Sequence, residues 1–184
     1  MSTGALALSL VATVHQRRGA ATDLISTADE VAAWCEEVGL GGPHPTSGPM
    51  QTRLRELREA IHRLATSPEW TGDEAVLSAI DVLNEAATRL APPELTSERS
   101  VRTIADADGA TVIAAIALDA IELLSTCSPN QIRECANEPC TSLFVDRSQA
   151  GRRRWCSMRT CGNRAHVAAH RRRRASGEPP DGPT

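Results

Sequence analysis

In residues 135–174 the sequence reads CANEPCTSLFVDRSQAGRRRWCSMRTCGNRAHVAAHRRRR, with two C-x4-C pairs separated by fifteen residues. Two short cysteine loops that lie one hairpin apart can bring four thiolates onto one tetrahedral zinc ion. A closed set of thiolates is typical of structural Zn²⁺ and leaves no open coordination position for catalysis. The expected ligands are Cys135, Cys140, Cys156 and Cys161.

A second ligand set is also possible in this stretch. His166 and His170 are four residues apart on one face of a predicted helix, so they could complete a mixed site with Cys135 and Cys140. We prefer the four-cysteine set because the second C-x4-C pair is otherwise unexplained. In addition, Cys161 at a helix start can place its thiolate near the positive end of the helix dipole.

Charge is divided unevenly along the chain. Residues 1–130 carry nine Arg against eighteen acidic residues, a balance of −9, whereas residues 131–184 carry eleven Arg against five, a balance of +6. An acidic body with a basic end indicates that the basic end binds a polyanion, and we expect DNA phosphate. The candidate contacts are Arg152, Arg153, Arg154, Arg164, Arg171, Arg172, Arg173 and Arg174.

Other roles remain open for these basic residues and their neighbours. Arginines near the cysteines could offset the formal charge of −2 that four thiolates leave on zinc, and residues 171–174 could be a solvated tail. Asn163 and Arg164 are types that read base edges or cap a helix, and for Asn163 we favour the structural role. Trp155 is expected to pack inside the finger.

Upstream of residue 130, apolar residues recur with helical spacing in five segments. Aromatic residues make up only 2% of the chain, so the core must consist of Ala, Leu, Ile and Val, which favours helices. The second segment has the clearest boundaries, because the capping box Thr27-x-x-Glu30 begins it and Gly39 ends it. The predicted helices are residues 5–18, 27–39, about 50–66, 71 or 73 to 90, and about 110–126.

The remaining segments complete the predicted architecture. Residues 94–109 lack helical periodicity and indicate an extended segment or a short hairpin. In the finger, 143–146 and 152–156 are the expected strands and residues from 160 to about 174 the expected helix. The prediction is mainly α: a helical domain of about five helices (1–128), a small C-terminal zinc finger (129–174; β-hairpin and helix, treble-clef-like) and a disordered tail (175–184).

The motif CSMRTCGNR, preceded by LFVDRS and RRRW, resembles the CGNR zinc-finger family over about residues 132–172. In that family the finger follows an N-terminal helical domain called ABATE, described as a stress-responsive transcriptional regulator. AAWCEEVGL and LRELREAIHRL are similar to the Trp-containing and Leu-Arg-Glu helices of that domain. The resemblance therefore implies a zinc-dependent regulator.

The chain departs from the family pattern at two places. The usual Asp-Phe-Val-Asn-Thr stretch is here Ser-Leu-Val-Ala-Thr at residues 9–13, so its acid and amide are missing. His166 stands where the family tends to have Lys. The first departure weighs against a ligand site built on those polar groups.

Function classes can also be excluded or favoured from the sequence. No catalytic motif is present, so we expect no enzyme. The apolar run 112–124 is too short to span a bilayer and contains Asp119 and Glu122, so we expect a cytoplasmic protein with no membrane partner. The leading hypothesis is a bacterial-type, zinc-containing, DNA-binding transcription regulator whose helical domain senses a signal, forms a homodimer or docks a partner. The alternative is a protein–protein interaction module in which the zinc finger only stabilises the fold.

Overall fold

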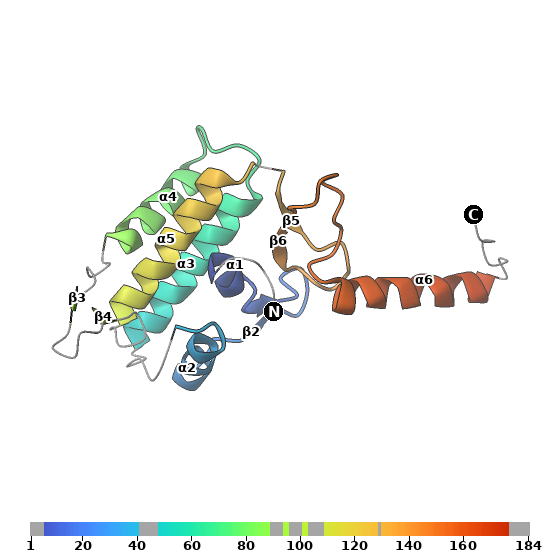
Figure 1. The fold of residues 1–184 in the computed structure, drawn as a ribbon, viewed down its shortest axis with the longest axis horizontal. Helices are drawn as coiled ribbons and strands as arrows, with labels where there is room; N and C mark the ends of the chain where they lie inside the picture. The colour runs from blue at the N-terminus through green and yellow to red at the C-terminus, as the bar shows by residue number, and fades with distance from the viewer. Residues whose placement is uncertain are drawn as a thin grey trace.

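Helices α3 (Gly48–Thr66), α4 (Glu74–Ala87) and α5 (Gly109–Thr126) lie side by side and form the body of the molecule (Figure 1). Helix α1 (Leu6–Val11) packs on α3 and α5, and α2 (Ala28–Glu37) packs on α3. The computed structural model describes residues 6–40, 48–88, 109–128 and 130–176, together with the backbone of two short strands at 94–95 and 101–102. Within these residues the fold is mainly helical, as the sequence predicted.

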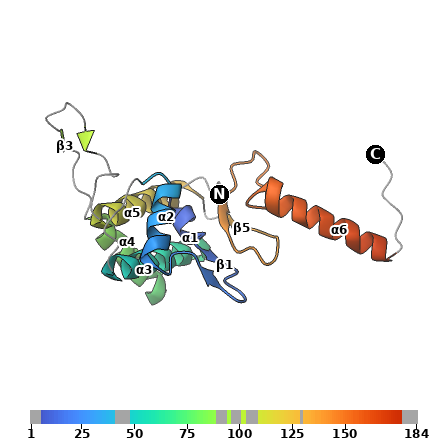
Figure 2. The same cartoon turned by 90° about the horizontal axis from the view of Figure 1, so that it is seen from below.

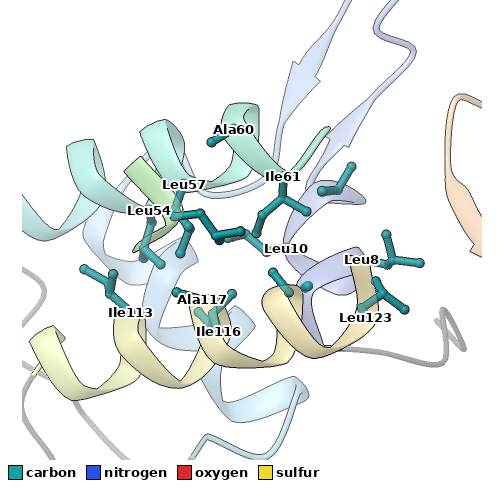
Figure 3. Close-up of a cluster of buried hydrophobic side chains, with 14 of the residues drawn as sticks. Leu8, Leu10, Leu54, Leu57, Ala60, Ile61, Ile113, Ile116, Ala117 and Leu123 are labelled. Atoms are coloured by element: carbon teal, nitrogen blue, oxygen red, sulfur yellow. The ribbon is translucent and has the colours of Figure 1, made fainter. Parts of the chain in front are cut away.

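The hydrophobic core lies between α1, α3 and α5, and Figure 3 shows its aliphatic side chains pointing toward one another. Helix α5 is apolar almost all round because α1, α3 and α4 all pack against it. Among the described helices it alone is long and apolar enough to cross a membrane by length and composition, and three other helices pack against it. Core residues that are fully or almost fully buried include Leu8, Leu10, Leu54, Leu57, Ile61, Ile116 and Ala117.

Asp119, an acid within the apolar helix α5, has a structural role. Its Oδ2 accepts a hydrogen bond of 2.7 Å from the backbone N–H of Ala7 in the first turn of α1. The first N–H groups of a helix have no partner inside the helix, and a carboxylate there also interacts favourably with the helix dipole. Asp119 therefore fixes the start of α1 on α5.

The first predicted helix, residues 5–18, is wrong in its second half. Helix α1 ends at Val11, and the chain turns into an antiparallel pair of strands, β1 (Val14–His15) and β2 (Thr22–Asp23). The hydroxyl of Thr13 donates to the carbonyl of Leu10 at 2.7 Å, and Gln16 adopts a φ of 55° in the turn that follows. The strand pair prevails over helical periodicity because a buried arginine on α3 holds it.

That arginine is Arg58, a residue that is only 4% exposed. Its Nη1 and Nη2 donate to the two carboxylate oxygens of Asp23 at 2.7 and 3.0 Å, and Nη1 also donates to the hydroxyl of Thr13 at 3.0 Å. The hydrogen bond from Arg58 is the main reason that the pKa of Asp23 is lowered, and burial acts in the opposite direction. A bidentate ion pair thus fastens β2 to the middle of α3.

The other helical predictions agree with the structure. The capping box on α2 is formed: the backbone N–H of Glu30 donates to the Thr27 hydroxyl at 3.2 Å, and the Glu30 carboxylate accepts from the Thr27 N–H at 2.9 Å. Asp73 caps α4. The short hairpin predicted within 94–109 is present as β3 (Glu94–Leu95) and β4 (Val101–Arg102). The predicted end of the fourth helix at residue 90 lies outside the described residues.

The finger contains the predicted β-hairpin, but one of its strands was assigned wrongly. Strand β6 (Leu143–Val145) pairs antiparallel with β5 (Ile132–Glu134), which precedes the first cysteine. Residues 152–156 form no strand. Their backbone groups bond elsewhere: the N–H of Arg153 donates to Asp146 at 2.9 Å, and the carbonyl of Arg154 accepts from Ala136 at 2.8 Å.

Strand β6 joins the finger to the helical domain. Leu143 and Val145 belong to the same buried cluster as the helix residues, with Ile132 of β5 packed against it. Phe144 points to the other face of the strand, where it is also buried, because side chains alternate along a strand. The backbone N–H of Arg17 also donates to the hydroxyl of Thr141 at 3.2 Å. The finger and the helical domain therefore share one hydrophobic core.

The last helix, α6 (Asn163–Ser176), extends away from the rest of the molecule in both Figure 1 and Figure 2. It follows a π-helical turn, η2 (Met158–Gly162), and contacts that turn and the ring of Trp155 at its base. The helix was predicted for residues 160–174, close to what is found. Of the predicted disordered tail, residues 175 and 176 complete the helix, and 177–184 lie outside the described residues.

Candidate metal centre and basic helix

The four cysteines come from two loops that hydrogen bonds tie together. Cys135 follows β5, and its N–H donates to the carbonyl of Ser142 at 3.0 Å. The N–H of Ala136 donates to the carbonyl of Arg154, and this hydrogen bond joins the first cysteine loop to the segment that enters the second. The N–H of Cys156 points at the sulfur of Cys135, 3.5 Å away. Cys161 lies in η2, immediately before α6.

The sulfur atoms form a compact cluster. All four Sγ atoms lie within 4.8 Å of one another, and each of the cysteines is free. The Cys140–Cys156 and Cys156–Cys161 sulfur distances are 3.8 and 3.7 Å. A disulfide needs about 2.05 Å, whereas a tetrahedral ion with metal–sulfur bonds of about 2.3 Å has ligands about 3.8 Å apart. The donor set therefore fits a tetrahedral metal ion.

Electrostatics in the cluster also favours a bound cation. Burial raises the pKa of Cys156, and the neighbouring Cys140 and Cys135 raise it further. Burial also raises the pKa of Cys161. At Cys140 burial acts upward too, but hydrogen bonds led by that of the Ser142 hydroxyl outweigh it and lower the pKa. Four thiols this close cannot all ionise unless a cation lies among them, and a metal ion would supply that charge.

The structure does not assemble the alternative ligand set with two histidines. The ring of His166 lies against that of Trp155, with centroids 5.4 Å apart and planes tilted by 54°. His170 is exposed on α6, one turn further from the cysteines. Within the described residues, the cluster of potential metal ligands consists of the four cysteines alone.

Asp146 organises the loop that leads to the second cysteine pair. Its Oδ1 accepts from the hydroxyl and N–H of Ser148 at 2.6 and 3.0 Å. Its Oδ2 accepts from the N–H of Arg153 at 2.9 Å and from Nη1 of Arg133 at 3.1 Å. These bonds, led by that of the Ser148 hydroxyl, lower the pKa of the buried Asp146 carboxyl to about 2. No role was predicted for Asp146 from the sequence, although Asp-x-Ser after a strand is a turn signal that could have identified it.

Arg153 holds the finger together from inside. Its Nε donates to the carbonyl of Trp155 at 2.9 Å, and Nη2 donates to the carbonyl of Cys156. Its guanidinium lies over the ring of Phe144, 4.7 Å from the centroid. Of the proposed phosphate contacts, Arg153 is thus the one that the structure places in a structural role beside the metal ligands.

We expect Asp146→Asn to weaken metal binding by roughly tenfold, because it removes the charge that aligns Arg153 beside Cys156. The sign of the pH dependence follows from the low pKa. The carboxylate contributes fully above about pH 4 and loses its contribution as pH falls toward 2. The ratio of the metal affinities of wild type and variant, measured by competition with a chromophoric chelator, should therefore stay constant between about pH 6 and 8.

Glu138→Gln is the matched control, since Glu138 is an exposed acid of the same finger in the first cysteine loop. It should leave metal affinity unchanged. Equal affinity of wild type and Asp146→Asn would contradict the role given to Asp146.

The base of α6 is fixed by Gly162, Trp155 and Met158. A Cβ on Gly162 would lie 2.9 Å from the sulfur of Met158, so a larger residue would displace the Met158 side chain, and it would be in van der Waals contact with the Trp155 ring at 3.4 Å. Trp155 packs inside the finger, as predicted. Asn163 differs from expectation: its side chain is exposed and makes no hydrogen bond within the described part of the chain, so the expected structural bond is not formed.

Most of the candidate phosphate contacts lie on the surface. Only Arg153 among them is partly buried. From residue 147 to residue 176 the chain contains ten arginines and no Asp or Glu. The exposed members of the predicted set are Arg152, Arg154, Arg164, Arg171, Arg172, Arg173 and Arg174.

These features define a helical domain with a small metal-binding finger and a protruding basic helix. Comparison with family models gives two matches. Residues 4–126 match ABATE, described as "Putative stress-induced transcription regulator", and residues 131–174 match the CGNR zinc finger. The chain therefore belongs to the ABATE family and carries a CGNR zinc finger at its C-terminal end. A search of curated proteins gave no match.

Proposed function

We propose that this chain is a non-catalytic transcription regulator of the cytoplasm that holds Zn²⁺ on its four cysteines and binds DNA through the basic finger. The all-sulfur donor set and sulfur separations near 3.8 Å support zinc, which favours four thiolates in closed tetrahedral sites. A reducing compartment keeps such thiols free to bind metal. The regulatory description of the ABATE family supports the role in transcription.

One observation carries the DNA-binding proposal: beyond Asp146 the chain carries arginines and no acid as far as residue 176. Ten arginines and no acid occupy residues 147–176, and seven of the eight predicted contacts are exposed. A surface of one charge sign next to an acidic body attracts a polyanion and directs it to the finger. Because the finger shares its core with the helical domain, a signal received by the helices would reach the DNA-binding surface directly.

Binding of the zinc-loaded protein to a short mixed-sequence DNA duplex should depend steeply on salt. If six to eight arginines contact phosphate, the log–log slope is about −5 to −7, measured by fluorescence anisotropy between about 50 and 200 mM salt. Changing Arg171, Arg172, Arg173 and Arg174 together to Ala should make the slope shallower by about 3 to 4.

The control carries Arg53→Ala and Arg63→Ala, which remove exposed arginines of α3 in the helical domain. It should bind DNA like the wild type. Metal analysis should give one zinc per chain in all three proteins. The proposal fails if the zinc-loaded wild type shows no salt-dependent binding, and association of the protein with itself or with another protein would then favour the interaction module.

A further inference from the structure

Helix α6 has two unlike faces. Residues spaced by four, three and four positions fall on one face of a helix. In α6 these residues are Asn163, Val167, His170 and Arg174, and we call this set the reading face. The opposite face carries the alanines at 165, 168, 169 and 175, together with Arg172. Ala165 and Ala169 are half-buried, whereas every member of the reading face is exposed.

The side chains of the reading face are available to a ligand. Within the described residues none of these four side chains makes a hydrogen bond or an ion pair, and Val167 is 43% exposed. Asn pairs with the edge of adenine, and Arg with that of guanine. An apolar side chain contacts the methyl group of thymine. The face thus has the chemistry that reads bases.

The dimensions of α6 match those of the DNA major groove. Fourteen residues make a helix of about 21 Å. With side chains its diameter is about 10–12 Å, and the major groove is about 12 Å wide and 8.5 Å deep. The contacts of α6 with η2 and Trp155 lie at its base, and the rest of the helix extends away from the body of the molecule. Arg164 and Arg171 lie on one flank of the reading face and Arg173 on the other, where phosphates of the two strands would be.

We propose that α6 is a recognition helix that lies in the major groove of duplex DNA and selects the sequence through its reading face. The inference rests on the proposed function, and it adds that binding is sequence-specific and names the element responsible. Recognition helices of other folds contact bases mainly with their N-terminal residues, and Asn163 is in that position here. The rigid finger beneath would set the angle at which the helix enters.

The test begins with selection from a pool of short duplexes with a random centre, using the zinc-loaded full chain. We expect enrichment of a motif of about three to four consecutive base pairs. Methylation of guanine N7 in the selected motif, which modifies the major groove, should interfere with binding. Duplex RNA should compete poorly, because its major groove is too narrow and deep for side chains to read.

The decisive variant carries Val167→Ala and His170→Ala, two exposed residues beyond the first turn of α6. It should lose about tenfold or more in preference for the selected duplex over a scrambled one, with an unchanged salt slope because no arginine is removed. The matched control, Ala168→Ser with Ala175→Ser on the opposite face, should keep the preference. Circular dichroism and zinc content should be the same in all three proteins.

The outcomes distinguish this inference from the function on which it rests. Salt-dependent binding without an enriched motif, or a motif that the Val167/His170 variant reads as well as the wild type, overturns the recognition helix and leaves DNA binding intact. Equal competition by duplex RNA also overturns it. Failure to bind any duplex overturns both.

Discussion

Replacing Cys156 by Ser is expected to weaken zinc binding by about a hundredfold to a thousandfold. Structural zinc contributes roughly 10–16 kcal/mol in small fingers, and one ligand of four accounts for about a quarter of that. The sulfur of Cys156 lies 3.8 and 3.7 Å from those of Cys140 and Cys161, as expected for one ligand of a tetrahedral site. Competition with a chromophoric chelator measures the change.

Loss of zinc should also destabilise the helices. Leu143 and Val145, which β6 inserts into the helical core, each contribute about 1.5–3 kcal/mol when buried. A finger that loosens without metal withdraws part of this contribution from a domain with about 5–15 kcal/mol in total. Hydrogen exchange in α1 and α3 should therefore accelerate in Cys156→Ser and in chelator-treated wild type.

Cys127→Ser provides the matched control, since Cys127 is a half-buried cysteine outside the metal cluster. It should bind zinc as the wild type does. If hydrogen exchange in α1 and α3 stays unchanged after complete removal of zinc, loss of the metal from the finger does not destabilise the helical domain through the shared core.

The second large effect is expected from Asp23→Asn, which should lower the free energy of unfolding by about 3 kcal/mol. The change removes the bidentate carboxylate partner of Arg58, which is 4% exposed, and leaves it, as a charged contact, only that of its Nε with the carboxylate of Glu59 at 3.0 Å. A buried charge that loses its main partner costs far more than the pair contributes, so Arg58→Met combined with Asp23→Asn should recover much of the loss. Urea denaturation of the three zinc-loaded proteins measures the differences.

The pH dependence of this effect has a definite sign. The pKa of Asp23 is lowered in the folded state, so its contribution is present above the unfolded value near 4 and is lost as pH falls through the lower folded value. Asp81→Asn, an exposed acid on α4, is the control and should change stability little. Equal stabilities of Asp23→Asn and wild type at pH 7 would show that the buried pair does not fasten β2.

Features that depend on neighbouring residues could be predicted from the sequence. The capping box of Thr27 and Glu30 lies within one turn, and the spacing of the cysteines alone indicates a metal site. The apolar faces of α3 and α5 follow from periodicity. In each of these cases the local pattern and the tertiary structure require the same conformation.

Features that depend on contacts between residues far apart in the chain could not be predicted from the sequence. Helix α1 ends early because Thr13 and Asp23 bond to Arg58, 45 and 35 positions away in the chain. The partner of β6 is β5 because Ile132 and Val145, which pair in the ladder, both face the helical core. Arg153 looks like its basic neighbours in sequence, and only the carbonyls and the ring around it give it a structural role.

The isolation of α6 has a further thermodynamic consequence. A helix of this length is marginally stable in water when nothing packs along it, and only its first turn is fixed here, by η2 and Trp155. Four consecutive arginines near its end repel one another, and DNA phosphates would remove that repulsion. Ordering of the last turns should therefore accompany DNA binding and offset part of its free energy, so that a substitution which lowers helix propensity at an exposed alanine, such as Ala168→Gly, would weaken binding without removing a contact.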